Sequence, residues 1–298
     1  MENAVDVTTH GCQSMVTPVR RMLLKDPRAA WLSQANVDAQ WQALNYLARP
    51  DFDAALAEYD ALVEILMGFG MELLWLPAND TTSLDSVYAH DPLIVANRGA
   101  ILGRMGKAAR APEPTAVGVF LESVGFPVLG RIETPGKLEG GDVLWMDEHT
   151  LAIGQGYRTN AEGIRQVRAI LGDDIDEIIP VPMPHWTGPA DCLHLMSFIS
   201  LVDHDLAVVY SRLMPVPFRE WLLERGMRLV EVPDEEYDSF GCNVLAVAPG
   251  VCIMIDGNPV TRRRLEEAGV EVHVYPGANI CIKGGGGPTC LTRPILRG

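Results

Sequence analysis

The stretch NVLAVAPGVCIMI at 243–255, followed by TRRRLEEA at 261–268 and GVEVHV at 269–274, decides the fold class. Its first part is mostly apolar and β-branched and turns at Pro249-Gly250, which predicts a two-strand hairpin. Its second part has helical spacing, and Gly269 is a good C-cap position. Its third part is again β-branched. The stretch therefore predicts one unit of strand, strand, helix and strand.

This unit recurs along the chain with a period of about fifty residues, the length of one supersecondary repeat. Helical patterns also occur at 54–67, 160–171 and 216–225, and a second hairpin pattern spans 142–154. Such a repeat is typical of a closed array or propeller, although chance similarity within an ordinary mixed α/β fold is the alternative. We predict one α/β domain over 1–298, built from five units at roughly 16–78, 84–132, 137–183, 190–233 and 236–298.

Composition restricts the classes of partner. The 298 residues carry a formal net charge of -15, which argues against nucleic acid and anionic membranes and mildly favours a small cationic substrate. No apolar run reaches the length of a membrane span, and residues 1–10 lack a signal-peptide pattern. Six scattered cysteines without a CxxC pair predict free thiols in the cytoplasm. Homo-oligomerisation is left open.

Cys290 follows a run of four glycines, residues 284–287. Such a run allows positive φ angles and a close approach of the backbone to a ligand. A cysteine in this place becomes a nucleophile if its surroundings stabilise the thiolate. The alternative is a glycine-rich loop with an incidental thiol.

Three further polar clusters stand near the starts of predicted strands, as Cys290 does. They are residues 85–92, 138–143 and 192–197, and each is surrounded by apolar strand sequence. Taken singly, each is a strand cap, a turn or a hydrogen-bonded core histidine. At equivalent positions of a repeat, a cysteine, a histidine and two carboxylates form a candidate site at the centre of the ring, where the first strands meet.

The chain resembles the guanidine-modifying penteins, which include dimethylarginine dimethylaminohydrolase, arginine deiminase and the amidinotransferases. The motifs are Glu139-Gly140-Gly141-Asp142, then Arg158-Thr159-Asn160, then His194-Leu195, and the glycine-rich loop before Cys290. The resemblance extends from about residue 16 to 297. It implies a five-bladed ββαβ propeller with pseudo-fivefold symmetry and no metal or organic cofactor.

The resemblance also implies catalytic roles. Cys290 would attack the guanidinium carbon and form a covalent S-amidino intermediate. His194 would protonate the departing amine and then activate water, while Glu139 holds the imidazole ring. A cationic substrate beside Cys290 would favour its thiolate.

The same resemblance implies substrate contacts for a small cationic guanidino amino acid. Asp91 would bind the guanidinium nitrogens, and Asp85 is a candidate for the α-amino group. Arg158, and Arg110 by its spacing from Asp91, would bind the α-carboxylate. His90 stands where the dimethylarginine hydrolases tend to have Glu, so it is a further substrate-side residue unless it points outward.

Three other positions bear on the substrate. Met196 stands where arginine deiminases and many amidinotransferases carry Asp, which argues against an ordinary arginine deiminase. The segment 26–36 resembles a lid, and its Trp31 either shields the intermediate or packs in the core. His185-Trp186 precedes the His194 strand and could line the same pocket. Cys192 and Cys281 are interpreted as core residues within strands.

The leading hypothesis is a cofactor-free cysteine hydrolase of dimethylargininase type, which gives citrulline and an amine. An amidinotransferase and an arginine deiminase or dihydrolase share the same intermediate. A non-catalytic pentein binding module is a different class, against which Cys290, His194 and Glu139 together argue. A metal hydrolase using His90, Asp91 and His194 lacks a supporting ligand motif.

Overall fold

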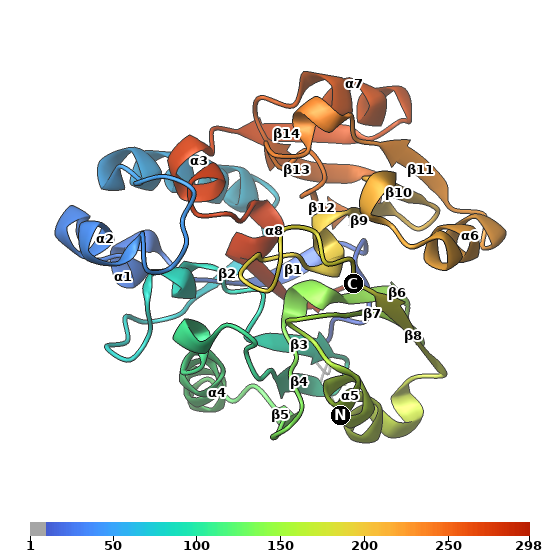
Figure 1. Ribbon diagram of the computed structural model, residues 1–298, viewed down its shortest axis with the longest axis horizontal. Coiled ribbons are helices and arrows are strands. Elements are labelled where there is room, and N and C mark those ends of the chain that lie inside the picture. Colours follow the sequence, from blue (N-terminus) through green and yellow to red (C-terminus); the bar gives the residue numbers. More distant parts are fainter. Residues whose placement is uncertain (1–9) are drawn as a thin grey trace, which may run out of the picture.

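The computed structural model describes residues 10–298, and its strands form five separate three-stranded sheets around a common centre (Figure 1). The sheets are, in order of their strands, β15 (Thr292–Arg297), β1 (Val19–Leu24) and β2 (Glu72–Trp75); β3 (Leu93–Ala96), β4 (Gly99–Leu102) and β5 (Val128–Arg131); β6 (Val143–Asp147), β7 (Thr150–Gln155) and β8 (Glu177–Pro182); β9 (Ile199–Asp203), β10 (Leu206–Val209) and β11 (Arg228–Glu231); and β12 (Leu245–Ala248), β13 (Val251–Ile255) and β14 (Glu271–Tyr275).

Every sheet has the same pairing. Its first strand is antiparallel to the second, and the second is parallel to the third. A parallel pair needs a crossover, and each crossover here includes one main helix. These helices lie on the outside of the ring (Figure 1): α3 (Phe52–Gly68), α4 (Glu113–Ser123), α5 (Ala161–Leu171), α6 (Val216–Glu224) and α7 (Pro259–Glu267). The predicted ββαβ propeller is confirmed.

The two ends of the chain close the ring. β15 pairs with β1, and the backbone of Arg297 donates to Gly11 O at 2.9 Å. The last strand thus serves as the first strand of the β1 sheet. Cys290 lies in α8 (Pro288–Leu291), directly before that strand, which is the position that the other polar clusters occupy in their own sheets.

Helix α5 shows why the repeat sequence folds in this way. Asn160 caps its N-terminus by accepting a hydrogen bond from Gly163 N, an interaction of about 1 kcal/mol. Ile164, Val167 and Leu171 form its buried face against the β6–β8 sheet, as their helical spacing predicts. Gly269 follows α7 with φ +92°, a conformation that side chains strain, so its C-cap role is confirmed.

Two short helices precede α3, namely α1 (Pro27–Ala30) and α2 (Gln34–Gln40). They hold Trp31, which is fully buried, donates its indole N–H to Leu84 O at 3.1 Å and packs edge-on to Tyr46. Trp31 is therefore packed in the core, as the second of the two expectations for it has it. Among residues 10–298, no helix combines the length and apolarity needed to cross a bilayer.

Candidate active site

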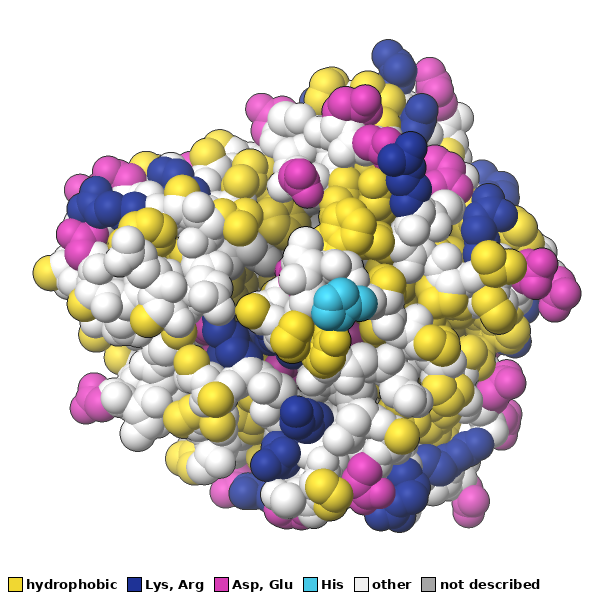
Figure 2. Space-filling model, in the orientation of Figure 1, with side chains coloured by type: hydrophobic (Ala, Val, Ile, Leu, Met, Phe, Trp, Pro, Cys, Tyr) yellow, Lys and Arg dark blue, Asp and Glu magenta, His cyan; other side chains and the backbone are white. Residues whose placement is uncertain are grey.

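A cavity of about 550 Å³ lies at the centre of the ring, where the polar segments before the first strands converge. In Figure 2, basic and acidic side chains show within a recess near the centre of the face, bordered in part by hydrophobic side chains. Of the predicted pair His185-Trp186, Trp186 lines the cavity, whereas His185 is not among its lining residues and lies 2.8 Å from the Tyr157 hydroxyl through Nδ1. Seven of the eight predicted site residues also line the cavity: Asp85, His90, Asp91, Arg110, Arg158, His194 and Cys290.

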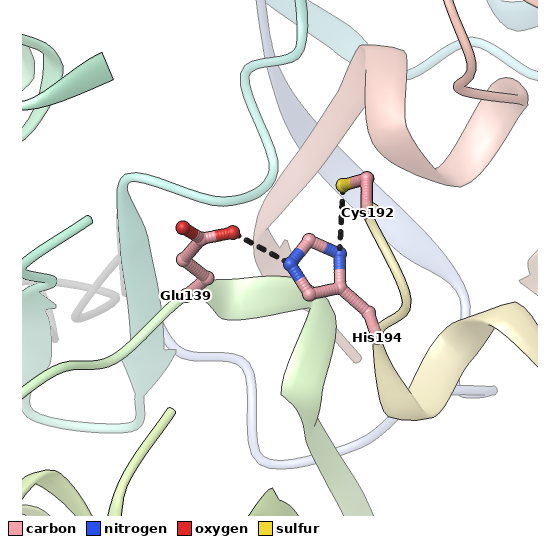
Figure 3. Close-up of side chains that lie close together, drawn as sticks. All are labelled: Glu139, Cys192 and His194. Atoms are coloured by element: carbon pink, nitrogen blue, oxygen red, sulfur yellow. Dashed lines mark hydrogen bonds and ion pairs between the residues drawn. The ribbon is translucent and has the colours of Figure 1, made fainter. Parts of the chain in front are cut away.

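Glu139, the eighth, lies directly behind His194 and is fully buried. Its Oε2 is 2.6 Å from His194 Nε2 (Figure 3), and its Oε1 accepts the backbone N–H groups of Gly106 and Lys107. Burial opposes ionisation of Glu139, but the hydrogen bond and charge of His194 outweigh burial and lower its pKa. The carboxylate thus fixes the ring and leaves Nδ1 on the cavity side.

His194 is held by its own segment as well. Its backbone N–H donates to Ser197 Oγ, and Asp142 Oδ1 accepts the next backbone N–H, from Leu195, at 2.9 Å. Burial alone would lower the pKa of His194, but the neighbouring Cys192, Asp91 and Glu139 outweigh it and raise that pKa well above its usual value. The imidazole is therefore protonated at neutral pH and can act as an acid.

Asp91 links His194 to a buried cation. Its Oδ2 is 2.5 Å from Arg110 Nη1, and its Oδ1 is 3.8 Å from His194 Nδ1. Arg110 also contacts Glu113 and donates to Tyr88 O at 3.0 Å. Burial raises the pKa of Asp91, yet the charges of His194 and Arg110 outweigh burial and keep it ionised. Arg110 is thus placed to orient Asp91.

Two further cations lie on this side of the cavity. Arg158 Nη1 is 3.3 Å from Glu139 Oε2, and its Nη2 donates to Asp191 O at 2.9 Å. Lys107 Nζ is 2.6 Å from Asp85 Oδ2 and is partly exposed. Sequence reasoning missed Lys107, because a lysine in a loop gives no periodic signal.

Cys290 lines the same cavity and has few polar partners. Asn243 Nδ2 donates to Cys290 Sγ at 3.3 Å, and Asn243 Oδ1 accepts Thr289 N–H at 3.0 Å. Burial raises the pKa of the Cys290 thiol to about 12, while the hydrogen bond from Asn243 lowers it. Sequence reasoning also missed Asn243, although it directly precedes β12, the same position that pointed to the other clusters.

The glycines are required by close contacts more than by positive φ. A side chain on Gly141 would collide with the His194 ring, and one on Gly286 would collide with the ring of Tyr88. A side chain on Gly287 would likewise collide with the side chain of Asn243. The loop can therefore bring Cys290 to these partners only because it lacks side chains.

His90 is buried, so the alternative in which it points outward is wrong. Its Nδ1 is 2.8 Å from Thr292 O, a carbonyl that can only accept, so Nδ1 carries the proton. Burial lowers the pKa of His90 to about 3, and the charge of Arg293 acts in the same direction. The ring is neutral, and with Nδ1 donating to Thr292 O its buried Nε2 carries a lone pair without a hydrogen-bond partner.

We predicted Cys192 and Cys281 to be core residues within strands, but neither of them lies in a strand. Cys192 is exposed in the loop before His194, and its Sγ is 3.9 Å from His194 Nδ1 (Figure 3). Cys281 is buried, but in a helical turn, where it contacts the Tyr275 hydroxyl at 3.2 Å. A short apolar run does not distinguish a strand from a loop that packs against one.

Comparison with known proteins agrees with this geometry. The family model described as arginine deiminase matches residues 83–217 and 215–297. The N(G),N(G)-dimethylarginine dimethylaminohydrolase of Streptomyces coelicolor is 30% identical over 222 residues, which cover 74% of this chain and 78% of that protein. This chain belongs to the guanidino-modifying pentein superfamily.

Other members of the superfamily extend the likeness to nearly the full chain. The Pseudomonas aeruginosa N(G),N(G)-dimethylarginine dimethylaminohydrolase is 29% identical over 229 residues, 76% of this pentein and 84% of that protein. A solved structure of a cysteine-to-serine mutant of the P. aeruginosa enzyme, complexed with citrulline, covers 94% of this pentein and 100% of that chain, with a TM-score of 0.75 and 25% identity. The likeness thus includes the ring and the strands around its centre.

Proposed function

We propose that this pentein is a cysteine-dependent hydrolase that cleaves a C–N bond in the guanidino group of an N-substituted arginine and releases citrulline and an amine. The observation that supports it most is that Cys290 and the chain of charges Glu139–His194–Asp91–Arg110 meet at one cavity. Cys290 offers a nucleophile, and the charged residues offer a carboxylate and an acid.

The first half of the reaction needs a thiolate and a proton donor. Asp91 binds the guanidinium nitrogens, and the substrate cation lowers the pKa of the nearby Cys290 thiol, which releases its proton to solvent. Cys290 Sγ then bonds to the guanidinium carbon. As the C–N bond breaks, His194 Nδ1 gives its proton to the amine that leaves. The substrate carbon is now attached to sulfur as an S-amidino group.

The second half reverses the proton transfer. His194, now neutral, takes a proton from water, and the resulting hydroxide attacks the amidino carbon. The C–S bond breaks, the urea group of citrulline forms, and the Cys290 thiolate is regenerated. Glu139 stabilises the imidazolium in both halves because its hydrogen bond to Nε2 keeps Nδ1 facing the reaction.

The amino-acid end of the substrate would bind to the remaining charges. We assign the α-amino group to Asp85 and the α-carboxylate to Arg158 and Lys107, which line the cavity. Arg110 was expected at the carboxylate, but its contacts with Asp91, Glu113 and Tyr88 O suit the role of orienting Asp91 better.

Met196 supports an N-substituted guanidine. It lines the cavity and is almost fully buried. A thioether is a weak acceptor for N–H groups but packs well against a methyl group. A carboxylate at this position would instead favour an unsubstituted guanidinium.

The test is a product analysis with arginine, N-monomethylarginine and asymmetric dimethylarginine. We expect citrulline and the matching amine, with higher kcat/KM for the methylated substrates. Ornithine as product would indicate a dihydrolase, and transfer of the amidino group to an added amine would indicate an amidinotransferase. No turnover of any guanidine would contradict the proposal.

A further inference from the structure

Three aromatic side chains that take no part in the proposed reaction line the central cavity. They are Trp186, Tyr237 and Phe240, and Trp186 is 48% exposed. The centroids of the Trp186 and Tyr237 rings are 6.2 Å apart and their planes meet at 85°, so the two rings form a corner. The buried ring of Tyr210 stacks on Tyr237 at 4.2 Å and supports it. The cavity therefore has an aromatic part whose position is fixed by packing.

The backbone holds two of these side chains in place against its own preference. Within residues 10–298, the residues other than glycine with positive φ are Leu32, Asn45, Trp186 and Phe240. All of them except Leu32 line the cavity. Bulky residues rarely adopt this conformation, and residues that do adopt it concentrate at functional sites. The strained positions thus point to a role for the aromatic part of the cavity.

The carboxylates of the cavity indicate which charge a ligand of this part would carry. Asp85 and Asp91 each form an ion pair with a cation of the protein. Asp191 and Asp238 also line the cavity, but neither takes part in an ion pair among the described residues. Burial raises the pKa of the Tyr237 hydroxyl, and the charges of Asp191 and Asp238 act in the same direction, which places both carboxylates near this ring. The aromatic corner therefore lies in a region of negative potential.

Aromatic faces and nearby negative charge together attract organic cations, because the ring quadrupole adds to the field of the carboxylates. The geometry points to a second subsite in the cavity, formed by Trp186, Tyr237 and Phe240, that binds an alkylammonium group. Such a group presents a positive charge and an apolar surface at once, and the rings can contact both. The cavity volume of about 550 Å³ lies within the range of roughly 300–1,000 Å³ that holds drug-sized ligands, so it has room for a substituent.

The subsite adjoins the segments that carry the proton donor and the partner of the nucleophile. Trp186 belongs to residues 183–194, a loop without helix or strand that ends at His194. Phe240 O accepts the N–H of Asn243 at 3.0 Å, and Asn243 contacts Cys290. The amine that leaves in the proposed reaction is the amine that His194 protonates, so this amine carries the alkylammonium group. This assignment rests on the proposed function, whereas the binding of a cation does not.

The first test measures binding without turnover. Choline and 3,3-dimethyl-1-butanol have nearly the same shape and differ in charge, and each is titrated into the wild-type protein with calorimetric detection. Choline should bind saturably and at least roughly fivefold more tightly than the neutral alcohol. Equal affinities would show an apolar surface that does not select a cation, and no saturable binding of choline would remove the subsite. Either result would overturn the proposal.

Substitutions locate the bound choline. Trp186→Leu keeps an apolar side chain but removes the ring face, so choline should bind roughly fivefold or more weakly. Asp238→Asn should weaken choline binding by roughly twofold at low ionic strength, and added salt should reduce this difference. Trp75→Leu is the matched control, because Trp75 is 39% exposed on β2 and does not line the cavity. Circular dichroism verifies folding. Equal binding to the Trp186→Leu and Trp75→Leu proteins would refute the aromatic corner as the site.

A pair of substrates tests the assignment to the leaving amine. Arginine carrying a 2-(trimethylammonio)ethyl group on a terminal guanidino nitrogen is compared with arginine carrying the neutral 3,3-dimethylbutyl group there. The cationic substrate should have at least roughly fivefold higher kcat/KM, and Trp186→Leu should bring this ratio close to one. A ratio of one in the wild-type enzyme would overturn the assignment even if choline bound. Failure of the protein to turn over any guanidine would contradict the proposed function and leave the choline result in force.

Discussion

The two walls of the central cavity differ in their electrostatic state. One, which we call the charged wall, consists of Asp91, Arg110, Glu139, Arg158 and His194, joined by ion pairs and hydrogen bonds. The other, the thiol wall, carries Cys290, whose sulfur accepts one hydrogen bond, from Asn243. The charged wall is fully ionised before substrate arrives, whereas burial keeps Cys290 a thiol.

The difference indicates how the nucleophile is activated. A histidine that is already protonated cannot take the proton of the thiol as a general base. If the substrate is a guanidinium, as proposed, its positive charge adds to that of His194 and lowers the pKa of the Cys290 thiol. A neutral molecule of the same shape would not do so, and we expect the proposed enzyme to select its substrate partly through charge.

The largest effect is expected from removing the nucleophile. Cys290→Ser should reduce kcat by on the order of 10³-fold or more, because a serine hydroxyl is not ionised by a neighbouring cation. The matched control is Cys192→Ser, which removes the other cavity thiol but leaves the nucleophile, so its kcat should fall far less than that of Cys290→Ser. Steady-state assays, with circular dichroism to verify folding, measure this. Full activity of Cys290→Ser would refute covalent catalysis by this residue.

Removal of the negative charge of Glu139 from the charged wall should have the next largest effect on activity. Glu139→Gln removes the charge that holds the His194 imidazolium, so kcat/KM should fall by roughly 10²- to 10⁴-fold. The pKa of His194 should fall too, and because His194 acts as an acid, the alkaline limb of the pH profile should move to lower pH. Glu122→Gln, on an exposed face of α4, is the control. If the alkaline limb did not move, Glu139 would not be the residue that sets the pKa of His194.

The surroundings of Cys290 can be changed without substituting any residue of the charged wall. Asn243→Ala removes the hydrogen bond to Cys290 Sγ, so its pKa should rise further and kcat/KM at neutral pH should fall by roughly tenfold or more. Activity should recover as pH rises, since thiolate then forms without help. Asn243→Asp keeps the acceptor for Thr289 N–H and adds negative charge, so it should be slower still. If activity were lost equally at all pH values, Asn243 would have only a structural role.

The smallest effect concerns selectivity. Met196→Asp should shift the ratio of kcat/KM for arginine over dimethylarginine upward by roughly tenfold, as a carboxylate replaces an apolar contact. Met196→Leu, which keeps an apolar side chain of similar volume, should leave the ratio nearly unchanged. Competition between the two substrates in one reaction measures this ratio. If both variants changed the kcat/KM ratio equally, Met196 would not determine the choice of substrate.

Sequence periodicity predicted those parts of the molecule that repeat. The helices at 54–67, 160–171 and 216–225 correspond to α3, α5 and α6, because an amphipathic helix on the outside of a blade must show its 3.6-residue period. The polar segments before the first strand of each sheet were predicted for a similar reason. A repeat places equivalent positions around one centre, so polar residues at these positions lie close together.

The features that sequence reasoning missed depend on side-chain direction within loops. Cys192 was interpreted as a core residue, but its loop turns it into the cavity beside His194. Asn243 precedes its strand just as the recognised clusters do, yet one amide does not indicate chemistry by itself. The contacts of Arg110 could not be predicted either. They connect Arg110 with Tyr88, Asp91 and Glu113, and they form only when the buried loop folds. No local pattern encodes such contacts.

Mass spectrometry of the intact protein, quenched during turnover, tests the central claim most directly. Offered arginine or a methylated arginine, the enzyme should carry an S-amidino adduct that peptide mapping places on Cys290, with a mass that identifies the transferred group. Glu139→Gln should help the adduct to accumulate if it slows the attack of water. Turnover to citrulline with no adduct in either protein, or an adduct on another residue, would contradict the account.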